Sequence, residues 1–168
     1  MQTLVFCNTV ESSRAVEYSI RENNINATSY HGDLNSRERG ANLDAFRNGD
    51  VQYLVCTDIA ARGKEYMRQM IYYALFCIIF DGYVGIDIPE VQHVVMFDFP
   101  LNAIDYLHRA GRTGRAGRTG IVTSLATKRD MVLATAIQGA ISRGLPIDNL
   151  SSAKRDYYDR GRLANVVG

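Results

Sequence analysis

The sequence predicts an α/β fold in which a parallel β-sheet is flanked by helices. Short apolar runs alternate along the chain with longer segments of helical periodicity, a pattern typical of βαβ units with right-handed crossovers. The chain has 168 residues, of which 46% are hydrophobic and 22% are charged. That length and composition favour one soluble globular core rather than two.

The strands expected in the first half of the chain are short, apolar and bounded by turn residues. They are Thr3–Cys7, Ala27–Tyr30 and Val51–Cys56. Thr9 follows the first strand and offers a helix N-cap, and apolar residues recur at helical spacing from there to Asn24. The second expected helix, Ser36–Asn48, is stopped by Gly49.

The second half continues the alternation. The expected elements are a strand at Gln92–Phe97, a short helix at Leu101–Leu107, a strand at Gly120–Ala126 and a helix at Asp130–Arg143. Because the carboxyl ends of parallel strands share one edge of a sheet, ligand sites are expected at that edge. Polar clusters follow the first three strands directly, namely Asn8-Thr9, His31-Gly32-Asp33 and Thr57-Asp58.

The run His108–Arg118 is rich in arginine and glycine and has neither a helical nor a strand period. Its arginines recur at every third position, as Arg109, Arg112, Arg115 and Arg118. A guanidinium is a rigid, permanent cation whose geometry suits phosphate oxygens. The run alone leaves two interpretations open: a solvated basic loop that contacts nucleic acid, or arginine fingers on a transferring phosphoryl group.

Composition restricts the remaining possibilities. The net charge is only +1, so any affinity for nucleic acid must come from local clusters of charge. Cys7, Cys56 and Cys77 are an odd set without a CxxC pair, which favours a reducing compartment and no disulfide or metal. We expect an intracellular protein with no membrane association. The compartment stays open because the chain begins directly in a strand, as a truncated N-terminus would.

Five motifs in order resemble the second, C-terminal helicase domain of DEAD-box ATP-dependent RNA helicases. They are Leu4–Thr9, Tyr30–Asp33, Thr57–Gly63, Ile86–Pro89 and His108–Arg115. The resemblance implies a RecA-like parallel sheet flanked by helices. It places the helicase domain at residues 1–149 and leaves residues 150–168 as a loosely ordered extension.

The resemblance also implies roles for individual residues. Contacts to the sugar-phosphate backbone of RNA would be made by Asn8, Thr9, Gly32, Arg39 and Thr57. Asp87 would face the ATP ribose, with Arg112 and Arg115 as the catalytic arginine fingers. Coupling between the lobes and sites would involve His108, Arg109, Asp58 and Arg62.

The chain contains neither a phosphate-binding loop with its lysine nor an Asp-Glu-Ala-Asp run. In the family both belong to a first, N-terminal lobe. We therefore expect ATP and Mg²⁺ to bind only together with that lobe, and the chain alone to be inactive. The alternative is a stand-alone RNA-binding or regulatory module. A lobe of another helicase class is disfavoured by the Asp-Ile-Pro that follows the Ala-Arg-Gly.

One segment departs from the family pattern. Lys64–Gly85 separates the Ala-Arg-Gly from Ile86, which follows almost directly in the family. A retained intron is the favoured interpretation, because removing the segment restores Ala-Arg-Gly-Ile-Asp-Ile-Pro without a seam. The other interpretation is a hairpin that docks a partner.

Overall fold

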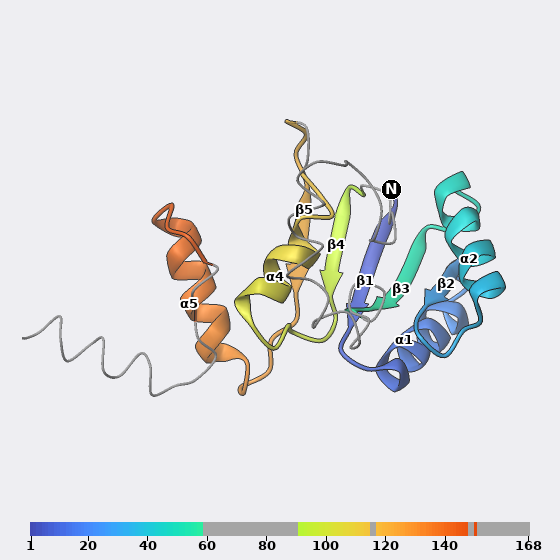
Figure 1. Cartoon of the computed structure of the whole chain (residues 1–168), viewed down its shortest axis with the longest axis horizontal. Coiled ribbons are helices and arrows are strands. Elements are labelled where there is room, and N and C mark those ends of the chain that lie inside the picture. The colour runs from blue at the N-terminus through green and yellow to red at the C-terminus, as the bar shows by residue number, and fades with distance from the viewer. Residues whose placement is uncertain (59–90, 115–116, 148–149, 151–168) are drawn as a thin grey trace, which may run out of the picture.

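The computed structural model describes residues 1–58, 91–114, 117–147 and 150. In this part of the chain, five parallel strands form one sheet in the order β2-β3-β1-β4-β5 (Figure 1). The strands are β1 Thr3–Cys7, β2 Ala27–Tyr30, β3 Tyr53–Thr57, β4 His93–Met96 and β5 Ile121–Ser124. The helices are α1 Val10–Glu22, α2 Ser36–Asn48, α4 Ala103–Ala110 and α5 Met131–Ser142. The expected parallel α/β fold is confirmed.

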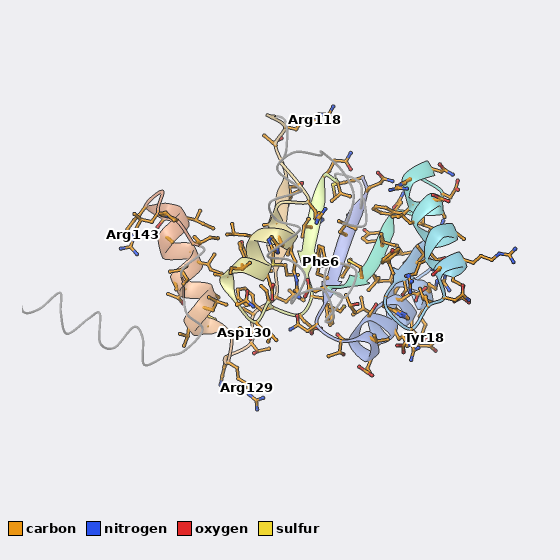
Figure 2. The ribbon with its side chains drawn as sticks, in the orientation of Figure 1. Phe6, Tyr18, Arg118, Arg129, Asp130 and Arg143 are labelled. Atoms are coloured by element: carbon orange, nitrogen blue, oxygen red, sulfur yellow. The ribbon has the colours of Figure 1, made fainter. Side chains whose placement is uncertain are left out.

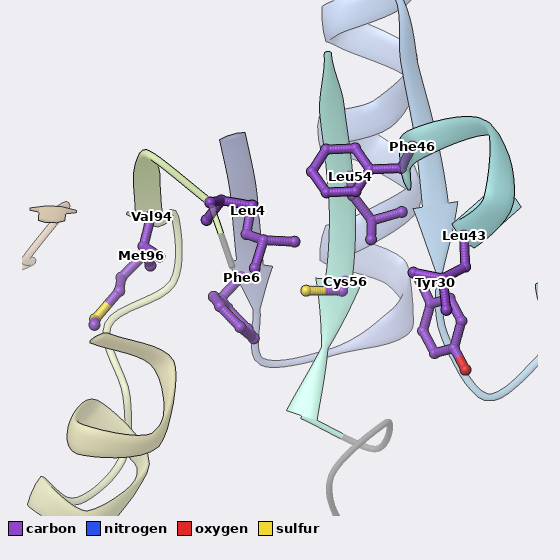
Figure 3. Packing of buried hydrophobic residues seen from close by; sticks show 10 residues of the cluster. Leu4, Phe6, Tyr30, Leu43, Phe46, Leu54, Cys56, Val94 and Met96 are labelled. Carbon is purple, nitrogen blue, oxygen red and sulfur yellow. The ribbon is translucent and has the colours of Figure 1, made fainter. Parts of the chain in front are cut away.

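The two faces of the sheet are covered by different helices. Along β1, alternate side chains point to opposite faces, as the pleat requires. Leu4 and Phe6 belong to the larger cluster, which α2 closes with Leu43 and Phe46 (Figure 3). On the opposite face lies a smaller cluster, made by Val5, Cys7, Val55 and, from α1, Val16.

Polar side chains fix where the helices begin. The Thr9 hydroxyl accepts a hydrogen bond from the Ser12 amide at 3.1 Å, which confirms Thr9 as the N-cap of α1. The expected position of α4 was wrong by a few residues: the helix begins at Ala103 and continues to Ala110. The reason is the Asn102 side chain, which accepts the amide of Asp105 at 2.9 Å and so starts the helix there.

The β5 end of the molecule has its own core. Leu133, Ile137 and Ala140 of α5 pack against Phe99 and the start of α4. None of the helices in the described ranges is long and apolar enough to cross a membrane. Within the same ranges, Cys7 and Cys56 are buried free thiols.

Two expectations lie outside the described residues. They are the insert Lys64–Gly85 and nearly all of the extension at 150–168.

Candidate functional site

The carboxyl edge of the sheet brings the polar clusters together. In the register of the central strands, Cys7 lies beside Thr57 and Tyr30 lies beside Cys56. The residues that follow these positions, Asn8, His31 and Asp58, therefore leave the sheet at the same edge. The expectation that these polar clusters gather at one edge of the sheet is confirmed.

A buried arginine is the centre of this edge. Arg109, near the end of α4, is only 1% exposed. Its Nε donates to Asp58 Oδ1 at 2.9 Å, and Nη2 forms a second, shorter contact with the same carboxylate. Nη1 donates to the main-chain oxygen of Asp98 at 2.8 Å, and Nη2 also donates to Asn8 Oδ1 at 2.6 Å. The guanidinium carbon lies 5.4 Å from the centre of the Phe6 ring, a cation–π distance.

Asp98 is a member of this network that sequence reasoning missed. Its Oδ2 accepts the main-chain amide of Asn8 at 2.9 Å. The Asn8 carboxamide also donates to the main-chain oxygen of Phe99 at 2.9 Å. The ends of β1, β3 and β4 are thus joined through side chains. The sequence did offer one signal, because Asp98 directly follows an expected strand, as Asn8 does.

Three of the residues assigned to RNA offer hydrogen-bond donors at this edge. Thr9 is exposed; its oxygen accepts from the Ser12 amide, and its hydroxyl donates to the neighbouring Glu11 carboxylate. Gly32 is exposed, and its amide donates to no other group in the described part of the chain. Thr57 is 1% exposed, and its hydroxyl has no hydrogen-bond partner among the described residues.

Arg39 lies on α2 beside the loop that follows β2. Its guanidinium donates to the main-chain oxygen of Leu34 at 2.5 Å and to the Ser36 hydroxyl at 3.3 Å. Ser36 is the first residue of this helix and Leu34 lies just before its N-cap, so the cation is held close to the helix N-terminus. That position adds to the positive potential of the helix dipole.

Gly32 lies between His31 and the ion-paired Asp33. Arg14 of α1 forms an exposed ion pair with Asp33 at 3.0 Å. His31 is 97% buried by accessible surface, and its pKa is lowered by burial and, to a smaller extent, by Arg14. Its imidazole is therefore neutral near pH 7, and Nδ1 has no partner in the described part of the molecule.

Arg112 lies one turn beyond Arg109. Its amide donates to the Arg109 main-chain oxygen at 3.1 Å, and its own main-chain oxygen accepts from Val91 at 3.0 Å. Thr113 donates its hydroxyl to the Val91 oxygen at 2.6 Å, which ties this segment to the start of β4. The half-buried Arg112 side chain makes no hydrogen bond or ion pair with the described residues. His108 is exposed in the last turn of α4.

The glycine-rich loop carries its outer arginine away from this network. Gly114 and Gly117 have positive φ angles of 73° and 77°, which favour glycine. Figure 2 shows Arg118 at the far end of the loop, well away from Phe6. Arg62, Asp87 and Arg115, which complete the predicted site, lie outside the described residues.

Neither described thiol at this edge is reactive at neutral pH. Burial raises the pKa of Cys7 to about 11, and burial also raises the pKa of Cys56. Among the described residues, no three His, Cys, Asp or Glu side chains come together in a way that could hold a metal ion.

Comparison with known proteins places this arrangement in context. Residues 1–117 match the model of the helicase conserved C-terminal domain. The chain is 42% identical over 153 residues to DEAD-box ATP-dependent RNA helicase 39 of Arabidopsis thaliana, covering 90% of this chain and 21% of that protein. The chain therefore spans about a fifth of the length of this relative.

Solved structures agree with the sequence comparison. The C-terminal domain of the DEAD-box protein Dbp5 is 29% identical with a TM-score of 0.64, covering 84% of this chain and 71% of that one. Dbp5 of S. cerevisiae bound to RNA and ADP BeF3 is 26% identical with a TM-score of 0.63, covering 95% of this chain and 37% of that one.

Proposed function

Because the chain belongs to the helicase C-terminal domain family and is of the DEAD-box type, we propose that it works as the second lobe of an ATP-dependent RNA helicase. In this role it binds the RNA backbone at the carboxyl edge of its sheet. It also supplies arginine fingers to ATP that a first lobe holds. The whole enzyme then couples ATP binding to local disruption of an RNA duplex.

The RNA side of the proposal uses donors that suit phosphate oxygens. A hydroxyl at Thr9, a main-chain amide at Gly32 and a guanidinium at Arg39 can position a sugar-phosphate backbone. The Thr57 hydroxyl lacks a partner among the described residues and is proposed as the fourth contact; because it is buried, it reaches RNA only when the residues that cover it move. Asn8 supports Thr9 through the network that occupies its carboxamide. The likeness to Dbp5 bound to RNA and ADP BeF3 supports RNA binding by this chain.

The ATP side uses Arg112 and Arg115 as fingers, with Asp87 facing the ribose. The Arg112 guanidinium has no partner among the described residues, and a guanidinium can stabilise charge on a transferring phosphoryl group. The described residues do not fit a Mg²⁺ site, so no metal-dependent step is assigned to this lobe. The phosphates and the metal belong to the first lobe in this proposal.

The proposal depends above all on the buried Arg109 guanidinium. It hydrogen-bonds to Asp58, which follows Thr57, and to Asn8, which precedes Thr9. The main-chain oxygen of Arg109 accepts a hydrogen bond from the amide of Arg112. Arg109 therefore joins the RNA side to the ATP side within this lobe, together with Arg62 near Asp58 in sequence. The exposed His108 is left to contact the first lobe.

ATP turnover with a first lobe added in trans tests this function. The chain alone should not hydrolyse ATP, because phosphates must be positioned before a finger can stabilise them. With a first lobe and RNA, turnover should appear, and Arg112→Ala should reduce it on the order of a thousand-fold. Arg118→Ala, at the far end of the same loop, is the matched control and should change turnover little. RNA-stimulated turnover by the chain alone would refute the two-lobe assignment.

RNA binding by the chain separates this function from a stand-alone module. Backbone contacts release counterions and read no sequence, so affinity should be weak, independent of base sequence and strongly reduced by salt. A clear preference for one RNA sequence would instead favour the regulatory module.

A further inference from the structure

Asp98 makes two different contacts in the network around Arg109. Its main-chain oxygen accepts from Arg109 Nη1 at 2.8 Å, whereas its carboxylate accepts the main-chain amide of Asn8 at 2.9 Å. The charge of Arg109 is already paired with Asp58 through two nitrogens. The Asp98 carboxylate is therefore not needed to neutralise the buried guanidinium.

The contacts of Asn8 show what the carboxylate does instead. Asn8 is held at three points: its amide by Asp98, its carboxamide nitrogen by the Phe99 oxygen, and its carboxamide oxygen by Arg109. Two of these three points belong to the segment after β4. A residue at the end of β1 is thus fixed by a chain segment about ninety positions away in sequence.

The fixed position of Asn8 also restricts Thr9. It directly follows Asn8 in an extended conformation, with φ −130° and ψ 161°, and caps α1. Because only the backbone torsions of residues 8 and 9 separate the held peptide from the Thr9 hydroxyl, holding Asn8 sets where that hydroxyl and the first amides of α1 point. Of these groups, the Thr9 hydroxyl is the one proposed to contact an RNA phosphate.

We propose that Asp98 is a positioning residue for the RNA-phosphate contact at Thr9, an inference that rests on the proposed function. A carboxylate close to a phosphate site repels the phosphate. A purely electrostatic effect would therefore make RNA binding tighter when Asp98 is neutralised. A positioning role predicts weaker RNA binding instead, because loss of the acceptor frees Asn8 and moves the Thr9 hydroxyl.

Fluorescence anisotropy of the full chain with a single-stranded homopolymer RNA at low salt shows whether loss of the Asp98 carboxylate tightens or weakens RNA binding. Asp98→Ala should weaken binding by about three- to tenfold, the range for a lost hydrogen bond to a charged group that is partly exposed. Asp98→Asn keeps an acceptor oxygen and should restore most of the affinity. Asp44→Ala, which removes an exposed carboxylate on α2, is the matched control and should not weaken binding.

A double-mutant cycle with Thr9→Ala tests whether Asp98 acts through Thr9. In the Thr9→Ala background, Asp98→Ala should have no further effect. An equal effect in both backgrounds, or unchanged or tighter binding by Asp98→Ala in the wild-type background, would overturn the proposal. If circular dichroism shows that Asp98→Ala does not fold, the same cycle is run with Asp98→Asn. This variant should lose at most twofold in RNA affinity in the wild-type background, and nothing further in the Thr9→Ala background.

The outcome also separates this inference from the function on which it rests. If Thr9→Ala weakens binding and the Asp98 variants do not, the RNA interface stands and the positioning role is wrong. If the wild-type chain binds no RNA at low salt, or Thr9→Ala binds as tightly as wild type, the RNA contact itself is wrong and Asp98 has nothing to position.

Discussion

Replacement of Arg109 by glutamine should destabilise the chain strongly. The change removes a buried cation and leaves the Asp58 carboxylate, the Asn8 carboxamide and the Asp98 main-chain oxygen without their donor. Breaking a buried ion pair by removing one partner typically costs about 3–5 kcal/mol.

The exposure of the partner decides where in that range the cost falls. The Asp58 side chain is 26% exposed, so water can solvate part of the released carboxylate. The total cost of the substitution is then near the lower end of that range, about 3 kcal/mol. For a chain of this size, 3 kcal/mol corresponds to a fall of about 10 °C in Tm.

Urea denaturation followed by far-ultraviolet circular dichroism measures this difference, because the chain has no tryptophan to report by fluorescence. Arg129→Gln removes an exposed arginine by the same substitution and should stay within about 0.5 kcal/mol of wild type. Arg109→Lys keeps the charge but not the planar set of guanidinium donors, and its free energy of unfolding should be intermediate. A loss below about 1 kcal/mol for Arg109→Gln would refute the view that this guanidinium holds the strand ends together.

Three further predictions concern stability and solubility. The pKa of His31 in the folded chain lies below 6.5, so the unfolded chain binds a proton more readily, and stability should fall as the pH drops below about 6.5; urea midpoints between pH 8 and 5 should show this slope, and His31→Gln should flatten it. Gly120→Ala should cost about 1–3 kcal/mol because the new Cβ would lie 2.3 Å from Thr113 Oγ1, whereas Gly40→Ala, which meets no atom within 4 Å, should not destabilise α2 by the same measurement. Deleting Lys64–Gly85 should increase the soluble fraction on expression, because that segment is rich in bulky apolar residues; lower solubility or stability of the deletion variant would count against the intron interpretation.

The sequence by itself determined the elements and their order, because those features depend on residues close together in the chain. Short apolar runs located all five strands of the described part, and a threonine after the first strand located the start of α1. The motifs also sufficed to identify the family. Only the boundaries shifted, as at α4, where the hydrogen bond of Asn102 to the Asp105 amide sets the first turn.

Only the tertiary structure decided which polar residues meet. The sheet places β1 between β3 and β4, an order unrelated to the order in sequence. That arrangement joins Arg109 to Asp58 across 51 positions and to Asn8 across 101 positions, and it turns Asp98 from an ordinary turn residue into a support for Asn8. No local pattern predicts such contacts, because each one depends on strand ends that become neighbours only when the whole sheet forms.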